Sequence, residues 1–183
     1  ENKNRSLAIL NSMSRIERFL VSQFEEREKS FHIKELNEQA EENGCTDVSP
    51  NKIRTIINFW VIKNWLKRKQ LTFSKNHLTI ISNCSKPELI NKLEKRHELA
   101  QFIIDYLYFK STQNISPDDA NKEQVLVEFS VHELREEYEG QNALFKLNIK
   151  LSDIEDALFY LSRINAIKIE GGFLVIYNRL SIE

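Results

Sequence analysis

The sequence predicts a mainly helical α+β protein that contains small β-hairpins. Three observations lead to this fold class: apolar residues recur at helical spacing over long stretches, short β-branched segments lie between them, and one order of elements occurs twice. The chain has 183 residues, of which 41% are hydrophobic and 29% charged, so it is long enough for two small domains. We therefore expect two compact units.

The first half of the chain reads as three helices and a short strand. The first helix runs through residues 15–26, and an extended segment at 30–33 follows. The second helix ends at Asn43-Gly44, where glycine accepts the left-handed conformation that ends many helices. The third begins at Ser49-Pro50, because serine caps the free amides and proline at the next position loses no hydrogen bond. The predicted buried residues of the first and third helices are Ile16, Phe19, Leu20, Phe24, Ile53, Ile56, Ile57 and Trp60.

A hairpin follows the third helix. Residues 65–66 and 71–73 are apolar or β-branched, and Lys75-Asn76-His77 forms a polar turn before the second arm at 78–81. The resulting order is helix, short strand, two helices and hairpin. This is the order of elements in a winged helix.

The second half repeats this order. A long helix starts at Lys86-Pro87, and Phe129-Ser130-Val131-His132-Glu133-Leu134 matches Phe31-His32-Ile33-Lys34-Glu35-Leu36. Ser152 and Glu155 form a predicted capping box at the start of the next helix. A final hairpin turns tightly at Gly171-Gly172. The one-sided apolar set of the long helix is Leu89, Leu93, Ala100, Ile103, Ile104 and Leu107. We predict tandem winged-helix domains, 1–85 and 86–183.

Charge is distributed unevenly along the chain. Although the net charge is −1, residues 48–87 contain eight lysines and arginines and no acidic residue. A local surface without acids favours binding to phosphates, and in a winged helix the third helix and the wing meet DNA. The predicted DNA-binding residues are Asn51, Lys52, Arg54, Thr55, Asn58, Lys67, Arg68, Lys69, Lys75 and His77.

Two alternatives remain open for this basic stretch. Lysines beside a buried stripe also keep a helix soluble, without any ligand. The wing alone, through Lys75, Asn76 and His77, is a second way for a winged helix to bind DNA.

The corresponding helix of the second unit opens with Asp153, Glu155 and Asp156. These carboxylates repel phosphates, so we expect this unit to bind protein or nothing. Acidic residues at a helix start also offset the positive end of the helix dipole, which is a purely structural role.

Other chemistry finds no support in the sequence. The four histidines and the two cysteines, Cys45 and Cys84, lack the spacing of a metal site. The chain has no GxxxxGK[ST] phosphate loop and no recognisable catalytic nucleophile. We expect no catalytic centre and no cofactor in this fragment. No apolar run reaches the roughly 20 residues of a membrane span, no secretory signal is recognisable, and the first residue is Glu1; we expect a cytoplasmic piece of a longer polypeptide.

Several segments of the second half resemble a known family. These are 93–100 (LEKRHELA), 127–134 (VEFSVHEL), 154–163 (IEDALFYLSR) and 171–178 (GGFLVIYN). They are similar to the region that follows the motor in large bacterial RecQ-family ATP-dependent DNA helicases. The four-cysteine zinc module of typical members is absent, and two winged units stand where one is usual.

The resemblance implies a function for the fragment. It would be a non-catalytic accessory of a 3′–5′ DNA helicase of DNA repair and recombination, associated with the bacterial nucleoid, and would anchor duplex or fork DNA through backbone contacts. ATP and Mg would be needed only in the motor, and other domains of the same polypeptide would be its partners. The alternative is a tandem winged-helix module for protein interaction, and a third reading is the DNA-binding domain of a replication or transcription initiator.

Overall fold

The computed structural model shows a mostly helical α+β protein, as the sequence predicts. The structure describes residues 2–23, 28–68, 77–113, 124–141, 149–169 and 177–181. The chain divides into an N-terminal unit, residues 11–94, and a C-terminal unit, residues 1–10 together with 95–183. The chain passes from one unit to the other between residues 10 and 11 and between residues 94 and 95, and each of these points lies within a long helix. The boundary predicted from the sequence lies between residues 85 and 86.

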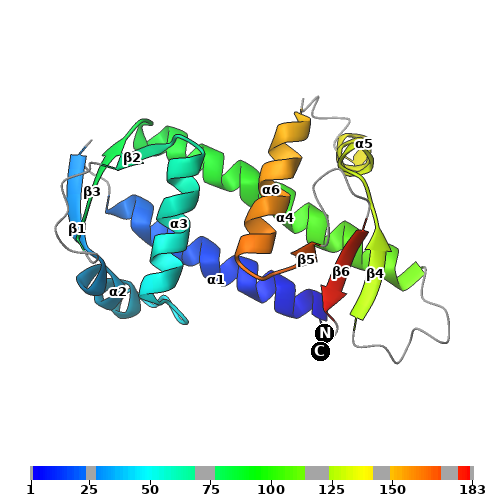
Figure 1. Ribbon diagram of the computed structural model, residues 1–183, viewed down its shortest axis with the longest axis horizontal. Coiled ribbons are helices and arrows are strands. Elements are labelled where there is room, and N and C mark those ends of the chain that lie inside the picture. Colours follow the sequence, from blue (N-terminus) through cyan, green and yellow to red (C-terminus); the bar gives the residue numbers. More distant parts are fainter. Residues whose placement is uncertain are drawn as a thin grey trace. The chain divides into compact units, whose positions relative to one another are not determined.

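The first six elements of the chain form three helices and one small sheet (Figure 1). Strand β3 lies at the centre of this sheet and pairs antiparallel with both β1 and β2. The elements are α1 (Asn2–Ser22), β1 (Glu28–His32), α2 (Ile33–Glu42), α3 (Pro50–Ile62), β2 (Leu66–Arg68) and β3 (His77–Ser82).

The next six elements repeat this arrangement. Strand β6 is central here and pairs antiparallel with β4 and β5, so the strand order β4-β6-β5 corresponds to β1-β3-β2. The elements are α4 (Lys86–Gln113), β4 (Gln124–Glu128), α5 (Val131–Gln141), α6 (Leu151–Arg163), β5 (Lys168–Ile169) and β6 (Tyr177–Ser181).

Helices α3 and α6 end in the same turn. Asn64 has a φ of 62°, its N–H donates to the Val61 carbonyl at 3.0 Å, and the N–H of Trp65 donates to the Trp60 carbonyl at 2.9 Å. The same φ and the same two bonds recur around Asn165. This pair of bonds is the Schellman motif, in which one left-handed residue lets the last carbonyls of the helix find donors.

Two predicted helix boundaries are confirmed. Gly44, after the end of α2, has a φ of +87°, which glycine adopts without steric cost. Before α3, the Ser49 hydroxyl accepts a hydrogen bond from the Lys52 N–H at 3.2 Å, and Pro50 occupies the first helical position.

Two local predictions are wrong. The capping box of α6 does not use Ser152 and Glu155: the helix begins at Leu151, and the Asp153 carboxylate accepts from the Lys150 N–H at 3.2 Å. In a capping box the side chain three residues after the N-cap accepts from the N-cap N–H, and the pair Lys150 and Asp153 meets that requirement two residues before the predicted pair.

The other error concerns the first hairpin. His77 lies in β3, opposite His32, and not in the turn. Lys75, Asn76, the predicted Gly171-Gly172 turn and Phe24 of the predicted first helix lie outside the described residues. On either side of the second predicted turn, Ile169 lies opposite Asn178.

Each unit has its own apolar core. In the N-terminal unit Ile53, Ile57 and Trp60 of α3 are at most 1% exposed. In the C-terminal unit the buried residues come mainly from one face of α4 and one face of α6. All six apolar residues predicted for the long helix are buried: Leu89, Leu93, Ala100, Ile103, Ile104 and Leu107.

Candidate nucleic-acid interface

The outer face of α3 carries a single stripe of residues, which we call the α3 stripe. It consists of Asn51, Arg54, Thr55, Asn58 and Ile62. Arg54 and Thr55 lie three and four residues after Asn51, and Asn58 and Ile62 continue the same helical spacing, so all five are on one side of the helix. Asn51, Asn58 and Ile62 are exposed. Arg54 and Thr55 are half-buried. Because α3 buries Ile53, Ile56, Ile57 and Trp60, this stripe lies on the side of the helix that faces away from the core.

Hydrogen bonds order the first turn of the stripe. The Arg54 guanidinium donates to Asn51 Oδ1 at 3.2 Å, and the Thr55 hydroxyl donates to the Asn51 carbonyl at 2.9 Å. Lys52 Nζ donates to the Asp47 carbonyl at 2.5 Å, so this ammonium is held by the connection between α2 and α3. The arrangement places a guanidinium and a side-chain amide together, and the N–H groups of both can donate to phosphate oxygens.

The structure brings some of the other predicted DNA-binding residues into the sheet of the same unit. Lys67 is exposed on β2, opposite Ile81 of β3, and Arg68 follows it in the strand. His77 belongs to β3. Lys69 and Lys75 lie outside the described residues.

One basic residue near this sheet was not predicted. Lys92 of α4 places its ammonium 6.0 Å from the centre of the Trp65 ring, which directly precedes β2. A cation over an aromatic face is attracted by the ring quadrupole. No sequence pattern predicts this pair, because the two residues come from elements that meet only in the folded chain.

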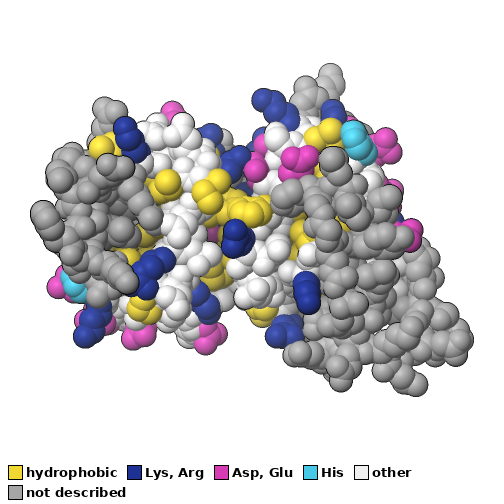
Figure 2. Space-filling model, in the orientation of Figure 1, with side chains coloured by type: hydrophobic (Ala, Val, Ile, Leu, Met, Phe, Trp, Pro, Cys, Tyr) yellow, Lys and Arg dark blue, Asp and Glu magenta, His cyan; other side chains and the backbone are white. Residues whose placement is uncertain are grey.

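The outer face of α6 has the opposite character. The positions that match the α3 stripe are found by aligning Asn165 with Asn64, the left-handed residues that end the two helices. At these positions α6 carries Ser152, Glu155, Asp156, Phe159 and Arg163, which we call the α6 stripe. Figure 2 shows acidic side chains over the first turns of α6, and basic side chains over the first turns of α3. The two repeats therefore have the same order of elements and differ in the charge on the outer face of the corresponding helix.

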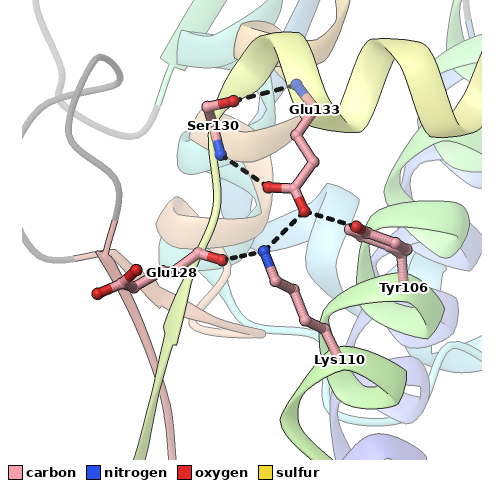
Figure 3. A network of polar contacts seen from close by, with 5 residues as sticks. All are labelled: Tyr106, Lys110, Glu128, Ser130 and Glu133. Atoms are coloured by element: carbon pink, nitrogen blue, oxygen red, sulfur yellow. Dashed lines mark hydrogen bonds and ion pairs between the residues drawn. The ribbon is translucent and has the colours of Figure 1, made fainter. Parts of the chain in front are cut away.

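A polar network in the C-terminal unit surrounds Glu133 (Figure 3). Its carboxylate accepts hydrogen bonds from the Tyr106 hydroxyl and Lys110 Nζ, both at 2.6 Å, and from the Ser130 N–H at 3.4 Å. The Ser130 hydroxyl accepts from the Glu133 N–H at 3.1 Å, which completes a capping box at the start of α5. Lys110 also donates to the carbonyl of Glu128.

The environment of Glu133 shifts two pKa values. Burial alone would raise the pKa of the Glu133 carboxyl, but the hydrogen bonds from Lys110 and Tyr106 and the Lys110 charge lower it below its ordinary value. Burial and the same carboxylate raise the pKa of Tyr106. The network joins α4 to β4 and α5, which is a structural role. The spacing Ser130-x-x-Glu133 is the sequence pattern of a capping box, and this cap was not predicted.

The described ranges contain no group of three histidine, cysteine, aspartate or glutamate side chains that could hold a metal ion. Among the helices in the described part of the chain, none combines the length and apolar character needed to cross a membrane. In comparisons with protein-family models, curated proteins and solved structures, none was found to match this chain.

Proposed function

We propose that both units are winged helices and that the N-terminal unit binds duplex or fork DNA through the α3 stripe and the β2–β3 wing. The proposal for the fold is supported by the repeated order of elements and by the central position of the last strand in each sheet. The observation that carries the DNA proposal is the α3 stripe, which lies within 40 residues that contain no acid, 48–87.

The contacts that this stripe supports are mainly contacts to the DNA backbone. Arg54, Lys67 and Arg68 supply positive charge for phosphates. Asn51 has an amide group that can donate to phosphate, the Thr55 hydroxyl donates to the Asn51 carbonyl within the helix, and Asn58 has an amide that can reach a base edge. We infer anchoring of DNA with little sequence preference.

The resemblance to RecQ-family helicases supplies the wider setting of the proposal. In that setting the chain is a non-catalytic accessory region, and a motor elsewhere in the polypeptide hydrolyses ATP with Mg and unwinds DNA in the 3′ to 5′ direction. The protein would act at the bacterial nucleoid in repair and recombination.

The second candidate function is a module for protein interaction. It is favoured by the α6 stripe, where Glu155 and Asp156 take the positions of Arg54 and Thr55. The same two carboxylates, with Asp153, disfavour the initiator reading, because an initiator would use both third helices to read bases.

Fluorescence anisotropy with labelled duplex, forked and single-stranded DNA over a range of salt concentrations tests the proposal. Arg54→Gln/Lys67→Gln removes two positive charges from the proposed interface. The matched control, Lys150→Gln/Lys168→Gln, removes two exposed positive charges from the C-terminal unit.

Each phosphate contact contributes about 0.9 to the slope of log affinity against log salt, so the interface variant should lower the slope by roughly 1.8 and the control should leave it unchanged. Absence of binding at low salt would refute the proposal. Equal losses in the two variants would show that only net charge matters, and would also refute it.

A further inference from the structure

Residues 43–44 form the only Asn-Gly pair in the amino-acid sequence. Asparagine deamidates most readily before glycine, because glycine has no side chain to hinder attack by its own backbone nitrogen. The pair lies where α2 ends, and both residues are exposed. Among the described residues, none outside the immediate chain neighbours places a heavy atom within 4 Å of the position that a Cβ on Gly44 would take. None of them therefore covers this side of the turn.

Deamidation at this pair needs water as its second reactant. The backbone nitrogen of Gly44 loses its proton and attacks Cγ of Asn43. The new N–Cγ bond forms, the Cγ–Nδ2 bond breaks, and ammonia leaves. Water then opens the cyclic succinimide at one of its two carbonyl carbons. One opening gives aspartate, and the other gives isoaspartate, in which Cβ of residue 43 has become part of the main chain.

In the folded chain both reacting groups are held in other hydrogen bonds. The Gly44 N–H donates to the Glu41 carbonyl at 3.1 Å, so the nitrogen keeps its proton and is directed at the helix. Nδ2 of Asn43 donates to the Gln39 carbonyl at 2.7 Å, which turns the side chain back toward the preceding turn of α2. Closure of the succinimide ring requires both of these bonds to break.

The same turn joins α2 to the core of the N-terminal unit. The N–H of Cys45 donates to the Ala40 carbonyl at 3.0 Å, and these two residues are 7% and 0% exposed. Together with the bond from Gly44 to Glu41, this is a Schellman motif, and Gly44 supplies its left-handed residue with a φ of 87°. The end of a helix opens at a smaller cost in free energy than a whole domain. This turn therefore controls access to the reaction.

We propose that Asn43 is a site of spontaneous modification and that the last turn of α2 controls its rate. The reaction is blocked while the turn is closed, and the Asn-Gly pair reacts as in an unfolded chain when the turn opens. The isoaspartate product lengthens the main chain before Cys45, so the two Schellman bonds do not re-form and the N-terminal unit loses stability. This inference does not depend on DNA binding.

The test compares the full chain, folded and in guanidinium chloride, during incubation at mildly alkaline pH. Isoaspartate at residue 43 is measured by enzymatic methylation and by mass spectrometry of the peptide that contains it. We expect the reaction in the folded chain to be slower by about tenfold or more, because only the open fraction reacts. Equal rates in the two states would overturn the proposal, and so would an Asn43 that stays unmodified in the denaturant.

The negative control is Asn43→Gln. Glutamine must close a larger ring and reacts far more slowly, so the isoaspartate signal should disappear from this peptide. A signal that persists in the variant would come from another residue and would overturn the assignment to Asn43.

A matched pair of variants tests whether the turn of α2 sets the rate. Gln39 is exposed, and both variants keep the carbonyl that accepts from Asn43. Gln39→Gly favours opening of the helix end and should deamidate roughly fivefold faster than Gln39→Ala, which favours the helix. Equal rates, with both variants shown to be folded by circular dichroism, would overturn the proposal. The comparison of folded and denatured chains uses the unaltered protein, so it decides the proposal even where the glycine variant does not fold.

Discussion

Glu133 shows how a single side chain can join three elements. Its carboxylate and amide bond to groups of α4 and to the connection between β4 and α5. Glu133→Ala removes the carboxylate that accepts from the Ser130 N–H in the capping box. It also leaves Lys110 and Tyr106 without this hydrogen-bond partner. We expect the free energy of unfolding to fall by about 1 to 2 kcal/mol, measured by urea denaturation.

The control for that measurement is Glu136→Ala, three residues later on the same helix. Glu136 is exposed, so its loss should change the free energy of unfolding by less than about 0.5 kcal/mol. Similar effects of the two substitutions would contradict the structural role given to Glu133.

Acid should weaken the protein through the same residue. The folded-state pKa of Glu133 is lowered from 4.5, so its ionised form is favoured in the folded protein. Its contribution to stability is present above the pKa of the unfolded chain and is lost as the pH falls through the lower folded-state value.

Glu133→Gln cannot ionise and should therefore lose less stability on acidification below about pH 4.5. Thermal melts of both proteins between pH 7 and pH 3 measure this difference. If the melting temperatures of the two proteins fell in parallel from pH 7 to pH 3, the ionisation of Glu133 would not be coupled to folding.

At the scale of elements, the two helix-ending asparagines offer an internal comparison. Both have a φ of 62°, a conformation that costs most residues with a Cβ. Asn165→Gly should stabilise the protein by about 0.5 kcal/mol, and Asn165→Ala should destabilise it by about 1 kcal/mol, as measured by urea denaturation.

Asn64→Gly should give no such gain. Asn83 Nδ2 donates to Asn64 Oδ1 at 3.3 Å, and glycine removes that acceptor, although the bond from Asn83 to the Asn64 carbonyl at 3.1 Å remains. Equal gains at both positions would mean that the side-chain bond contributes nothing.

For the whole molecule, the first residues of the chain belong to the unit formed by its last residues. Ser6, 3% exposed, donates to the Ala166 carbonyl at 2.7 Å and shares a hydrogen bond with the Tyr108 hydroxyl at 3.0 Å. Lys3 forms an ion pair with Asp105 at 3.0 Å. The first turns of α1 therefore complete the C-terminal unit.

Removal of residues 1–10 should consequently lower hydrogen-exchange protection at the end of α6 and in the second half of α4. Protection within α2 and α3 should fall less. The milder change Ser6→Ala should cost about 1 to 2 kcal/mol, because a buried carbonyl loses its donor. Unchanged protection in α4 and α6 after the deletion would contradict the division of the chain.

The amino-acid sequence predicted the order of elements, the buried faces of α3 and α4, the end of α2 and the start of α3. These depend on local properties: the spacing of apolar residues, the cap at Ser49 and the backbone freedom of Gly44. The basic and acidic characters of α3 and α6 were also readable, because charge is carried by composition.

Four features became visible in the folded chain alone: the strand registers, the Glu133 network, the place of Lys92 beside Trp65, and the inclusion of residues 1–10 in the C-terminal unit. Each of these joins residues that are distant in sequence, and such pairs are selected by packing and hydrogen bonding in the folded chain. A local sequence pattern does not show which distant residue a side chain will contact, because many distant residues have suitable chemistry.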